Sequence, residues 1–416
     1  MTKPVKKNPV HACLDRLMIQ ENELIFAGRT MQELADLAGQ TPFYAYSEKL
    51  MTERVQELRR AMPDFVHLHY AIKANPHPAV VQHFATLVDG LDVASGGELR
   101  VALASGMRPA SISFAGPGKQ REELHAAVEA GIVINMESHR EMHLISELGT
   151  ELGKRPKVAI RVNPDFELKA SGMRMGGGPK QFGIDAELVP EVLRQLPELG
   201  LDFQGFHVFS GSQNLRPEAI CEAQTLTIEL ATKLSKAAPG PIRMLNIGGG
   251  FGIPYFPGED YLDLKPIADN LERLRPAIEN AMPEAEVIIE LGRYLVGEAG
   301  IYVCQIIDHK VSRGETFLIA DGGLHHHLAA SGNFGQVIRK NYPVVIGNRV
   351  RASGAGAGAA SVVGPLCTPL DLLADKMPLA HGEVGDMVTV LQSGAYGYTA
   401  SPHLFLSQPM PVEICV

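Results

Sequence analysis

One lysine stands where an apolar run of the chain turns. In the stretch "HYAIKANPHP" (69–78), Lys73 follows an apolar run and directly precedes Ala-Asn-Pro. A lysine amine can form an imine with an aldehyde, although lysines also flank strands as solvated charges. The later features that could share chemistry with this amine are His207, the triple glycine Gly248, Gly249 and Gly250, Glu290 and Arg293.

These residue types, taken together, suit one cofactor. Pyridoxal phosphate needs a lysine for its imine, and backbone N–H groups exposed by glycines at a helix N-terminus can hold its phosphate. A carboxylate opposite the pyridine nitrogen keeps that nitrogen protonated, and a flat imidazole can pack against the ring. Each residue also has an ordinary explanation, because His207 could be a core histidine, the glycines a tight turn and Arg293 a surface charge.

The segment 43–291 alternates short β-type runs with longer amphipathic stretches. The expected strands are FYAYS, HLHYAIKA, GLDVAS, ISFAGPG, VINMES, KVAIRVNP, FQGFHVFSG, MLNIGGG and EVIIELG. The expected helices cover 48–62, 77–87, 96–106, 120–130, 138–152, 186–197, 215–237 and 261–282. This alternation predicts a parallel sheet with helices outside it, and the number of units favours a closed (β/α)8 barrel; a doubly wound open sheet is the alternative.

In such a barrel the carboxyl ends of the strands meet at one mouth, where reactive groups collect. The residues expected at those ends are Lys73, Asp92, Ser95, Gly116, Arg161, Asn163, His207, Ser210, Gly248, Gly249, Gly250, Glu290 and Arg293. We therefore expect the cofactor site at this mouth.

The sequence pattern changes after about residue 290. Runs such as IYVCQIIDHKV, TFLIADGG, YPVVIGN and DMVTVLQSG are rich in β-formers and are divided by turns. This pattern predicts an antiparallel β domain. The expected domains are a pyridoxal-phosphate-binding barrel over 43–290 and a β domain over 291–416, to which 1–42 can add a strand.

Composition and charge argue against several classes of protein. The 416 residues are 45% hydrophobic and carry a net charge of -9, which describes a well-buried globular protein and disfavours nucleic-acid binding. No run approaches about eighteen apolar residues, so we expect no membrane partner and no export. The five cysteines form no CxxC pair and no disulfide framework, which indicates the cytoplasm.

Seven motifs occur in order along the chain, namely YAIKAN, LDVASGGEL, FHVFSGSQ, NIGGGFGIPY, ELGRYLV, VVGPLCTPLD and GAYG. The series resembles the fold type III, alanine-racemase-like decarboxylases that depend on pyridoxal phosphate, in particular the ornithine and diaminopimelate decarboxylase group. The resemblance runs from about residue 40 to the C-terminus. It implies a barrel followed by a β domain, and a homodimer whose active sites are completed across the interface.

The resemblance also implies roles for single residues. Lys73 matches the imine-forming lysine, His207 the residue that stacks on the ring, and Glu290 the partner of the pyridine nitrogen, which favours decarboxylation. The positions that match the phosphate site are Ser210, Gly248, Gly249, Gly250, Arg293 and Tyr396, and those that match supporting residues near the cofactor are Asp92 and Arg161. Cys367 matches a cysteine that the partner subunit presents, and which returns a proton to the substrate Cα.

Departures from the family's pattern concern the substrate. Ornithine and diaminopimelate decarboxylases have an acid after that cysteine, which binds the distal amino group, whereas this chain has Thr368. A buried ammonium without a counter-charge is costly, so a distal amine is disfavoured, although Asp371 lies nearby. The stretch "DGGLHHHLAAS" lacks the arginine and tyrosine of diaminopimelate enzymes, and we count its His326, with Thr368 and Asp371, among the candidate substrate contacts.

Two further stretches raise questions about ligands. Three adjacent histidines, His325, His326 and His327, would point to alternating faces of an extended chain, so we expect no metal site there. The loop 171–181, with Arg174 and Lys180, could contact an acidic carrier protein or be an ordinary mobile loop.

The segments GGLHHH, MRMGGGPKQFGID and CTPLD most resemble the branch of the family that acts on a glutamyl group tethered to an acyl carrier protein, and decarboxylases of exosortase and exopolysaccharide loci. The expected activity is removal of the α-carboxylate of an L-amino acid, with the tethered glutamyl group as the leading substrate. The alternatives are decarboxylation of free diaminopimelate, ornithine or lysine, racemisation, and non-catalytic binding of pyridoxal phosphate.

Overall fold

The computed structural model describes residues 10–166, 173–174, 176–351 and 358–416. The chain forms two compact units. We call Thr52–Gly252 with Leu262–Leu295 the barrel unit, and the described parts of Met1–Met51, Ile253–Tyr261 and Val296–Val416 the β unit.

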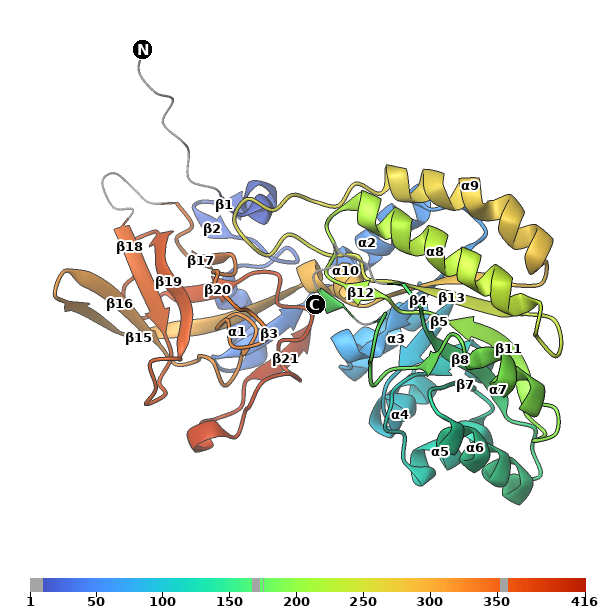
Figure 1. The fold of residues 1–416 in the computed structure, drawn as a ribbon. Coiled ribbons are helices and arrows are strands. Elements are labelled where there is room, and N and C mark those ends of the chain that lie inside the picture. The colour runs from blue at the N-terminus through green and yellow to red at the C-terminus, as the bar shows by residue number, and fades with distance from the viewer. Residues whose placement is uncertain (1–9, 167–172, 175, 352–357) are drawn as a thin grey trace, which may run out of the picture. The chain divides into compact units, whose positions relative to one another are not determined.

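The barrel unit contains a closed ring of parallel strands (Figure 1). In ring order these are β4 (Val66–Ala71), β5 (Gly90–Val93), β6 (Ile112–Phe114), β7 (Val133–Met136), β8 (Lys157–Asn163), β11 (Asp202–His207), β13 (Met244–Gly249) and β14 (Glu286–Leu291). The ring closes because β14 pairs with β4, and a short strand, β10 (Ile184–Asp185), adds to β8 outside it. The predicted (β/α)8 barrel is confirmed.

Helices surround this ring (Figure 1). They are α2 (Glu48–Ala61), α3 (Pro78–Ala85), α4 (Gly96–Ala104), α5 (Arg121–Ala130), α6 (His139–Leu152), α7 (Val189–Gln195), α8 (Pro217–Ser235) and α9 (Lys265–Ala281). Capping explains where several begin and end. The hydroxyls of Ser95 and Ser138 accept backbone N–H groups in the first turns of α4 and α6, while Gly131 and Gly153 end α5 and α6 with the positive φ that glycine tolerates.

The β unit is built on one sheet of eight strands. The strands are β3 (Phe43–Tyr46), β15 (Gly300–Ser312), β16 (Glu315–Ala320), β17 (Val344–Ile346), β18 (Gly358–Val363), β19 (Leu372–Leu379), β20 (Met387–Val390) and β21 (Val412–Cys415). Most pairs are antiparallel, as predicted, but β16 pairs with β18 and β3 with β21 in parallel. The smaller elements in the two units are β1 (Ile19–Gln20), β2 (Glu23–Leu24), α1 (Met31–Ala38), β9 (Met173–Arg174), β12 (Gly211–Ser212) and α10 (Arg293–Val296).

One expected barrel strand lies elsewhere. The sequence pattern places the run FYAYS among the barrel strands, but β3 pairs with β15 and β21 in the sheet of the β unit. All four residues of β3 are buried, which is also the burial of a barrel strand, so its composition did not reveal its partners. The expectation that the barrel begins at residue 43 is therefore wrong.

Apolar packing in the β unit joins segments from both ends of the chain. One buried cluster combines Leu34 of α1 with Phe43, Ile301, Val303 and Met387. Among the described residues, no helix is long and apolar enough to cross a membrane.

Candidate active site

Lys73 lies in a single 3-10 turn, Ile72–Ala74, directly after β4. Ile72 and Ala74 are buried, whereas the Lys73 side chain is 42% exposed. Its Nζ lies 3.4 Å from Oε1 of Glu290 and 5.2 Å from the centre of the Phe209 ring. The turn therefore anchors the backbone on both sides and directs the amine into the barrel mouth.

Glu290 is the penultimate residue of β14 and is 6% exposed. Nε2 of His207, at the end of β11, lies 3.2 Å from its Oε2, although the geometry is not that of a hydrogen bond. Burial alone would raise the pKa of Glu290, but the charges of Lys73, His207 and Arg161 hold that pKa well below its usual range. Glu290 is therefore an ionised carboxylate beside a lysine amine and an imidazole.

The triple glycine lies at the end of β13, whose last two residues are Gly248 and Gly249, and has no room for side chains. Gly248 and Gly250 have φ of +69° and +72°, and a Cβ on Gly250 would stand 2.1 Å from the carbonyl oxygen of Gly211. A Cβ on Gly249 would stand 2.3 Å from the carbonyl oxygen of Glu290. These glycines thus place bare backbone at the same barrel mouth.

Ser210 and Arg293 are the other two phosphate-site candidates of the barrel unit. Ser210 is half-buried, three residues beyond the end of β11, and Arg293 opens α10 directly after β14. The strands β11, β13 and β14 are consecutive neighbours in the ring, so the serine, the glycines and the arginine follow adjacent strand ends.

Asp92 and Arg161 are buried in the barrel unit. Oδ1 of Asp92 accepts from Ser113 Oγ at 2.5 Å and lies 3.2 Å from Nδ1 of His69. Arg161, on β8, donates from Nη1 to Glu137 Oε1 at 2.9 Å and lies over the ring of Phe182, 4.8 Å from its centre. Both residues are therefore held by side chains of neighbouring barrel strands and loops.

Cys367 lies in the loop that joins β18 to β19 in the β unit. Among the five cysteines it is the exposed one, whereas Cys13 and Cys304 are buried and Cys221 and Cys415 half-buried. Burial raises the pKa of each of those four thiols, that of Cys13 to about 12 and that of Cys415 to about 11.

Tyr396 also belongs to the β unit, in the segment that follows β20. It is half-buried and has a φ of +53°, the left-handed conformation that is uncommon for a side chain of this size.

Two predicted substrate contacts have structural partners instead. Asp371 is 3% exposed, and its carboxylate accepts the backbone N–H groups of Leu324 at 2.6 Å and Leu366 at 2.8 Å. His326 is 1% exposed, and its ring nitrogens lie 3.1 Å from the Tyr302 hydroxyl and 2.8 Å from a backbone carbonyl. These buried contacts favour a local structural role for both over contact with substrate. Thr368 is half-buried in the Cys367 loop.

The histidine triplet lies in a turn, so the extended chain assumed for it is wrong. His327 contacts Ser393 Oγ at 3.0 Å and accepts the backbone N–H of Ala330. His325 is buried, and neither of its ring nitrogens has a hydrogen-bond partner in the described chain. Burial lowers the pKa of all three, to about 4 for His325 and about 3 for the other two.

The loop considered for a carrier protein is only partly described. Residues 171, 172 and 175, and the Arg174 side chain, lie outside the described part, whereas Lys180 is exposed. The side chain of Asn163 holds the later part of this loop, because it donates to the carbonyl of Gly178 and accepts from the N–H of Gly177.

Several buried polar residues of the barrel unit were not singled out from the sequence. They are His69, Lys119, Glu137 and Glu141. A signal existed for Glu137, because it follows the buried run VINM at a strand end, where the other candidates also lie. Lys119 and Glu141 gave no comparable signal.

The residues of the barrel mouth fit pyridoxal phosphate. Lys73 supplies an accessible amine, Glu290 a buried anion, and the triple glycine a cradle that any Cβ would fill. The ring nitrogens of buried His207 have no hydrogen-bond partner in the described chain, which leaves the imidazole available to a flat ligand. A phosphate, an aldehyde and a pyridinium could each find a complementary group here.

Comparison with known proteins decides the family. Residues 48–297 match the family described as "Pyridoxal-dependent decarboxylase, pyridoxal binding domain". The chain belongs to the pyridoxal-dependent decarboxylases. This membership confirms the resemblance seen in the seven motifs, the expected carboxy-lyase activity and the cofactor.

Similar proteins include decarboxylases of different substrates. The chain is 38% identical to the L-glutamyl-[BtrI acyl-carrier protein] decarboxylase of Niallia circulans, over 90% of this chain and 88% of that protein. It is 34% identical to the diaminopimelate decarboxylase of Aquifex aeolicus, over 96% and 92%. Its fold is similar to the crystal structure of the M. jannaschii diaminopimelate decarboxylase with L-lysine, at 25% identity, a TM-score of 0.87 and the same coverage, 96% and 92%.

Proposed function

We propose that this pyridoxal-dependent decarboxylase acts on a glutamyl group that is attached to an acyl carrier protein. The observation that carries the proposal is the Cys367 loop, which offers no carboxylate to a distal ammonium. Its one acid is Asp371, and that carboxylate already accepts two backbone N–H groups while 3% exposed. Thr368 stands where relatives acting on diamino acids have an acid, so a neutral distal group is accommodated without an unpaired buried charge.

We assign the cofactor to the carboxyl ends of the barrel strands. Lys73 would bind the aldehyde carbon, Ser210, the triple glycine and Arg293 would hold the phosphate, and Glu290 would face the pyridine nitrogen. His207 would pack against the ring, and Arg161 and Asp92 would support it. When bound, pyridoxal phosphate withdraws electrons from the substrate Cα, which lets the α-carboxylate leave as carbon dioxide.

Glu290 and Cys367 would handle the charge and the proton of this reaction. The Glu290 carboxylate keeps the ring nitrogen protonated, since an anion opposite that nitrogen stabilises its positive charge. Cys367 of the partner subunit would deliver a proton from Sγ to the substrate Cα after carbon dioxide leaves. Its position at an exposed loop tip supports this role, because a buried thiol could not reach the site of another subunit.

We further propose that two chains form a dimer with shared active sites, to which each β unit contributes Tyr396 and Cys367. Large apolar side chains are exposed on the β unit, namely Phe334, Val337, Ile338, Leu370, Leu404, Phe405, Leu406 and Met410. Leu370 belongs to the Cys367 loop itself, and exposed apolar side chains of this kind are typical of protein interfaces. Five free cysteines agree with a cytoplasmic enzyme.

A carrier protein would approach as an acidic partner. Exposed Lys180, in the loop before β10, offers a positive charge for it. The Lys180→Glu variant should raise KM about tenfold for the carrier-bound substrate and leave KM unchanged for glutamyl-pantetheine. Lys233→Glu, at an exposed position of α8, is the control and should change neither value.

The second candidate is decarboxylation of a free diamino acid, which the 34% identity to the diaminopimelate decarboxylase of Aquifex aeolicus favours. The test is carbon dioxide release from glutamyl-carrier protein, glutamate, diaminopimelate, ornithine and lysine, measured side by side. We expect the highest kcat/KM for glutamyl-carrier protein. A higher value for diaminopimelate, ornithine or lysine would overturn the substrate, and an inverted enantiomer without carbon dioxide would indicate a racemase.

A further inference from the structure

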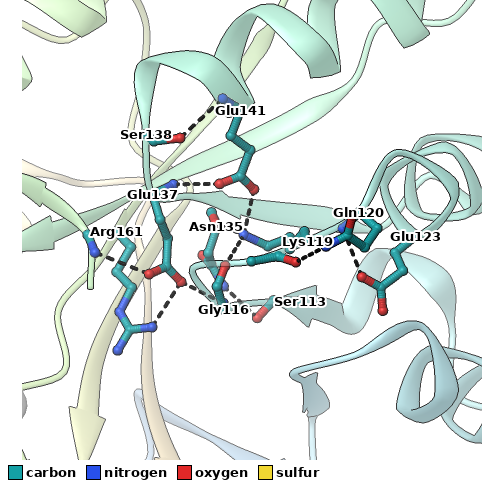
Figure 2. Close-up of polar contacts among 12 residues, drawn as sticks. Ser113, Gly116, Lys119, Gln120, Glu123, Asn135, Glu137, Ser138, Glu141 and Arg161 are labelled. Carbon is teal, nitrogen blue, oxygen red and sulfur yellow. Dashed lines mark hydrogen bonds and ion pairs between the residues drawn. The ribbon is translucent and has the colours of Figure 1, made fainter. Parts of the chain in front are cut away.

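A cluster of four buried charges lies in the barrel unit and contains just one of the predicted site residues, Arg161 (Figure 2). The other three members are Lys119, Glu137 and Glu141. Every one of these side chains is at most 8% exposed. Two cations face two anions, so the cluster is neutral as a whole, as buried charges must be if they are to be tolerated.

Glu137 is the point where the contacts of this cluster meet (Figure 2). Its Oε1 accepts the backbone N–H of Gly116 at 2.5 Å and Nη1 of Arg161 at 2.9 Å. Its Oε2 accepts the backbone N–H of Gly183 at 3.1 Å. Since all three partners are donors, the position requires a group that only accepts, which is an ionised carboxylate.

The pKa of Glu137 agrees with an ionised carboxylate at this position. Burial alone would raise the pKa of Glu137, but the charges of Arg161 and Lys119 and the hydrogen bonds that it accepts bring the pKa below its usual range. The three partners of Glu137 lie after β6, within β8 and before β10, while Glu137 itself follows β7. One carboxylate therefore fixes the ends of consecutive barrel strands.

Lys119 and Glu141 form a second ion pair next to the backbone of Glu137. The Lys119 amine donates to the carbonyls of Gly116 at 2.8 Å and Asn135 at 2.9 Å and to Glu141 Oε1 at 2.5 Å, which uses all three of its protons. The other oxygen of Glu141 accepts the backbone N–H of Glu137 at 3.0 Å. This second pair therefore holds the backbone of Glu137 as well as balancing its charge.

The cluster reaches the barrel mouth through Arg161. In the parallel register Arg161 lies opposite His207, and its charge is one of those that lower the pKa of Glu290. An arginine with a long, flexible side chain needs a fixed partner if its charge is to stay at one place. Glu137 is that partner, and Phe182 covers the guanidinium.

We propose that Glu137 is a positioning residue of the cofactor site, which sets the place of the Arg161 guanidinium, with Lys119 and Glu141 as its support. The proposal rests on the proposed function, because it takes the barrel mouth to be where pyridoxal phosphate binds. Glu137 acts through Arg161 and has no direct contact with the reacting atoms.

The test is a double-mutant cycle on the affinity for pyridoxal phosphate, measured by equilibrium dialysis of the apoprotein. Glu137→Gln should weaken binding about tenfold or more. This is the loss expected for a charge-assisted hydrogen bond, because the amide N–H₂ of the glutamine would face a donor that now contacts the carboxylate. Arg161→Gln should weaken it similarly. Because Glu137 acts through Arg161, the double variant should bind about as weakly as Arg161→Gln alone.

Glu123→Gln is a matched control. Glu123 also accepts backbone N–H groups, those of Gly96 at 2.6 Å and Gln120 at 2.9 Å, and it lies in the same region of the barrel unit (Figure 2). No contact of Glu123 leads to an arginine in the described chain, so its variant should keep the wild-type affinity for pyridoxal phosphate.

The outcomes separate the two proposals. Independent, additive effects of Glu137→Gln and Arg161→Gln, or equal affinities of Glu137→Gln and Glu123→Gln, would overturn the positioning role while the wild type still binds pyridoxal phosphate. A wild type that does not bind it would overturn the site itself. If Glu137→Gln does not fold, Glu137→Asp, which keeps the charge and shortens the side chain, should show the same coupling to Arg161→Gln with a smaller loss, and wild-type affinity in that variant would contradict the proposal.

Discussion

Replacing Glu290 by Gln tests whether this carboxylate serves the reaction or only the fold. Glutamine has nearly the same shape, so the change removes the negative charge with little change in volume. In the structure, the Glu290 oxygens lie 3.4 Å from Lys73 Nζ and 3.2 Å from His207 Nε2. The variant should therefore separate an electrostatic contribution from a packing contribution.

The two contributions should differ in size. Because the pKa of Glu290 is lowered in the folded state, loss of its charge should lower stability, but Lys73 is 42% exposed and can be hydrated, so we expect a loss of about 1–2 kcal/mol. An anion about 4 Å from a cation in a protein contributes roughly 4 kcal/mol before screening. If that energy is lost at the protonated ring nitrogen, kcat should fall about 10³-fold.

The assay combines carbon dioxide release with thermal unfolding of the same preparations. Glu286→Gln is the control, since Glu286 is exposed at the opposite end of the same strand, β14. We expect a large loss of kcat for Glu290→Gln with a Tm only a few degrees lower, and no change in either quantity for Glu286→Gln. A Glu290→Gln enzyme with kcat within threefold of wild type would refute the assignment of Glu290.

Three further predictions follow from the site. Gly249→Ala should destabilise the protein by about 1–3 kcal/mol in urea unfolding and weaken pyridoxal phosphate binding, because its Cβ would stand 2.3 Å from a carbonyl oxygen. Gly240→Ala is the control and should do neither, since a Cβ at that position would have nothing within 4 Å. Thr368→Glu should lower kcat/KM for glutamyl-carrier protein about tenfold and raise it for ornithine or lysine. An unchanged preference among these substrates would contradict the proposed substrate. Glu137, whose pKa is lowered in the folded state, stabilises the protein above the ordinary glutamate pKa of about 4.3, and this contribution is lost as the pH falls below that value. The urea midpoint of the apoprotein should therefore fall less steeply below about pH 4.3 in Glu137→Gln than in wild type, and equal slopes would contradict the assignment.

Local pattern was enough to predict the barrel. Short buried runs alternate with helices along this part of the chain, and that alternation leaves few topologies. The run at Phe43–Tyr46 has the same pattern, yet its partners, β15 and β21, come from the far end of the chain. Pairing between distant segments is not encoded in local periodicity, which is why this strand was misplaced.

The candidate site could likewise be predicted only as far as its residues lie at the ends of the barrel strands. Lys73, His207 and Glu290 stand at strand ends, and the barrel topology alone brings such ends together. Glu137 and Asp371 each accept a backbone N–H group from a residue distant in the chain, 46 and 47 residues away. Such contacts depend on the path of loops, so the sequence indicated neither the structural role of Asp371 nor the cluster around Glu137.

The most direct test of the account asks which lysine holds the cofactor. Treatment of the enzyme with pyridoxal phosphate and sodium borohydride should fix the lysine bond permanently, and peptide mass spectrometry should then locate it. We predict a modified Lys73 and an unmodified Lys119, because the Lys119 side chain is 1% exposed and uses all three protons in hydrogen bonds. A modification on Lys119 or another lysine, with Lys73 unchanged, would contradict the central claim.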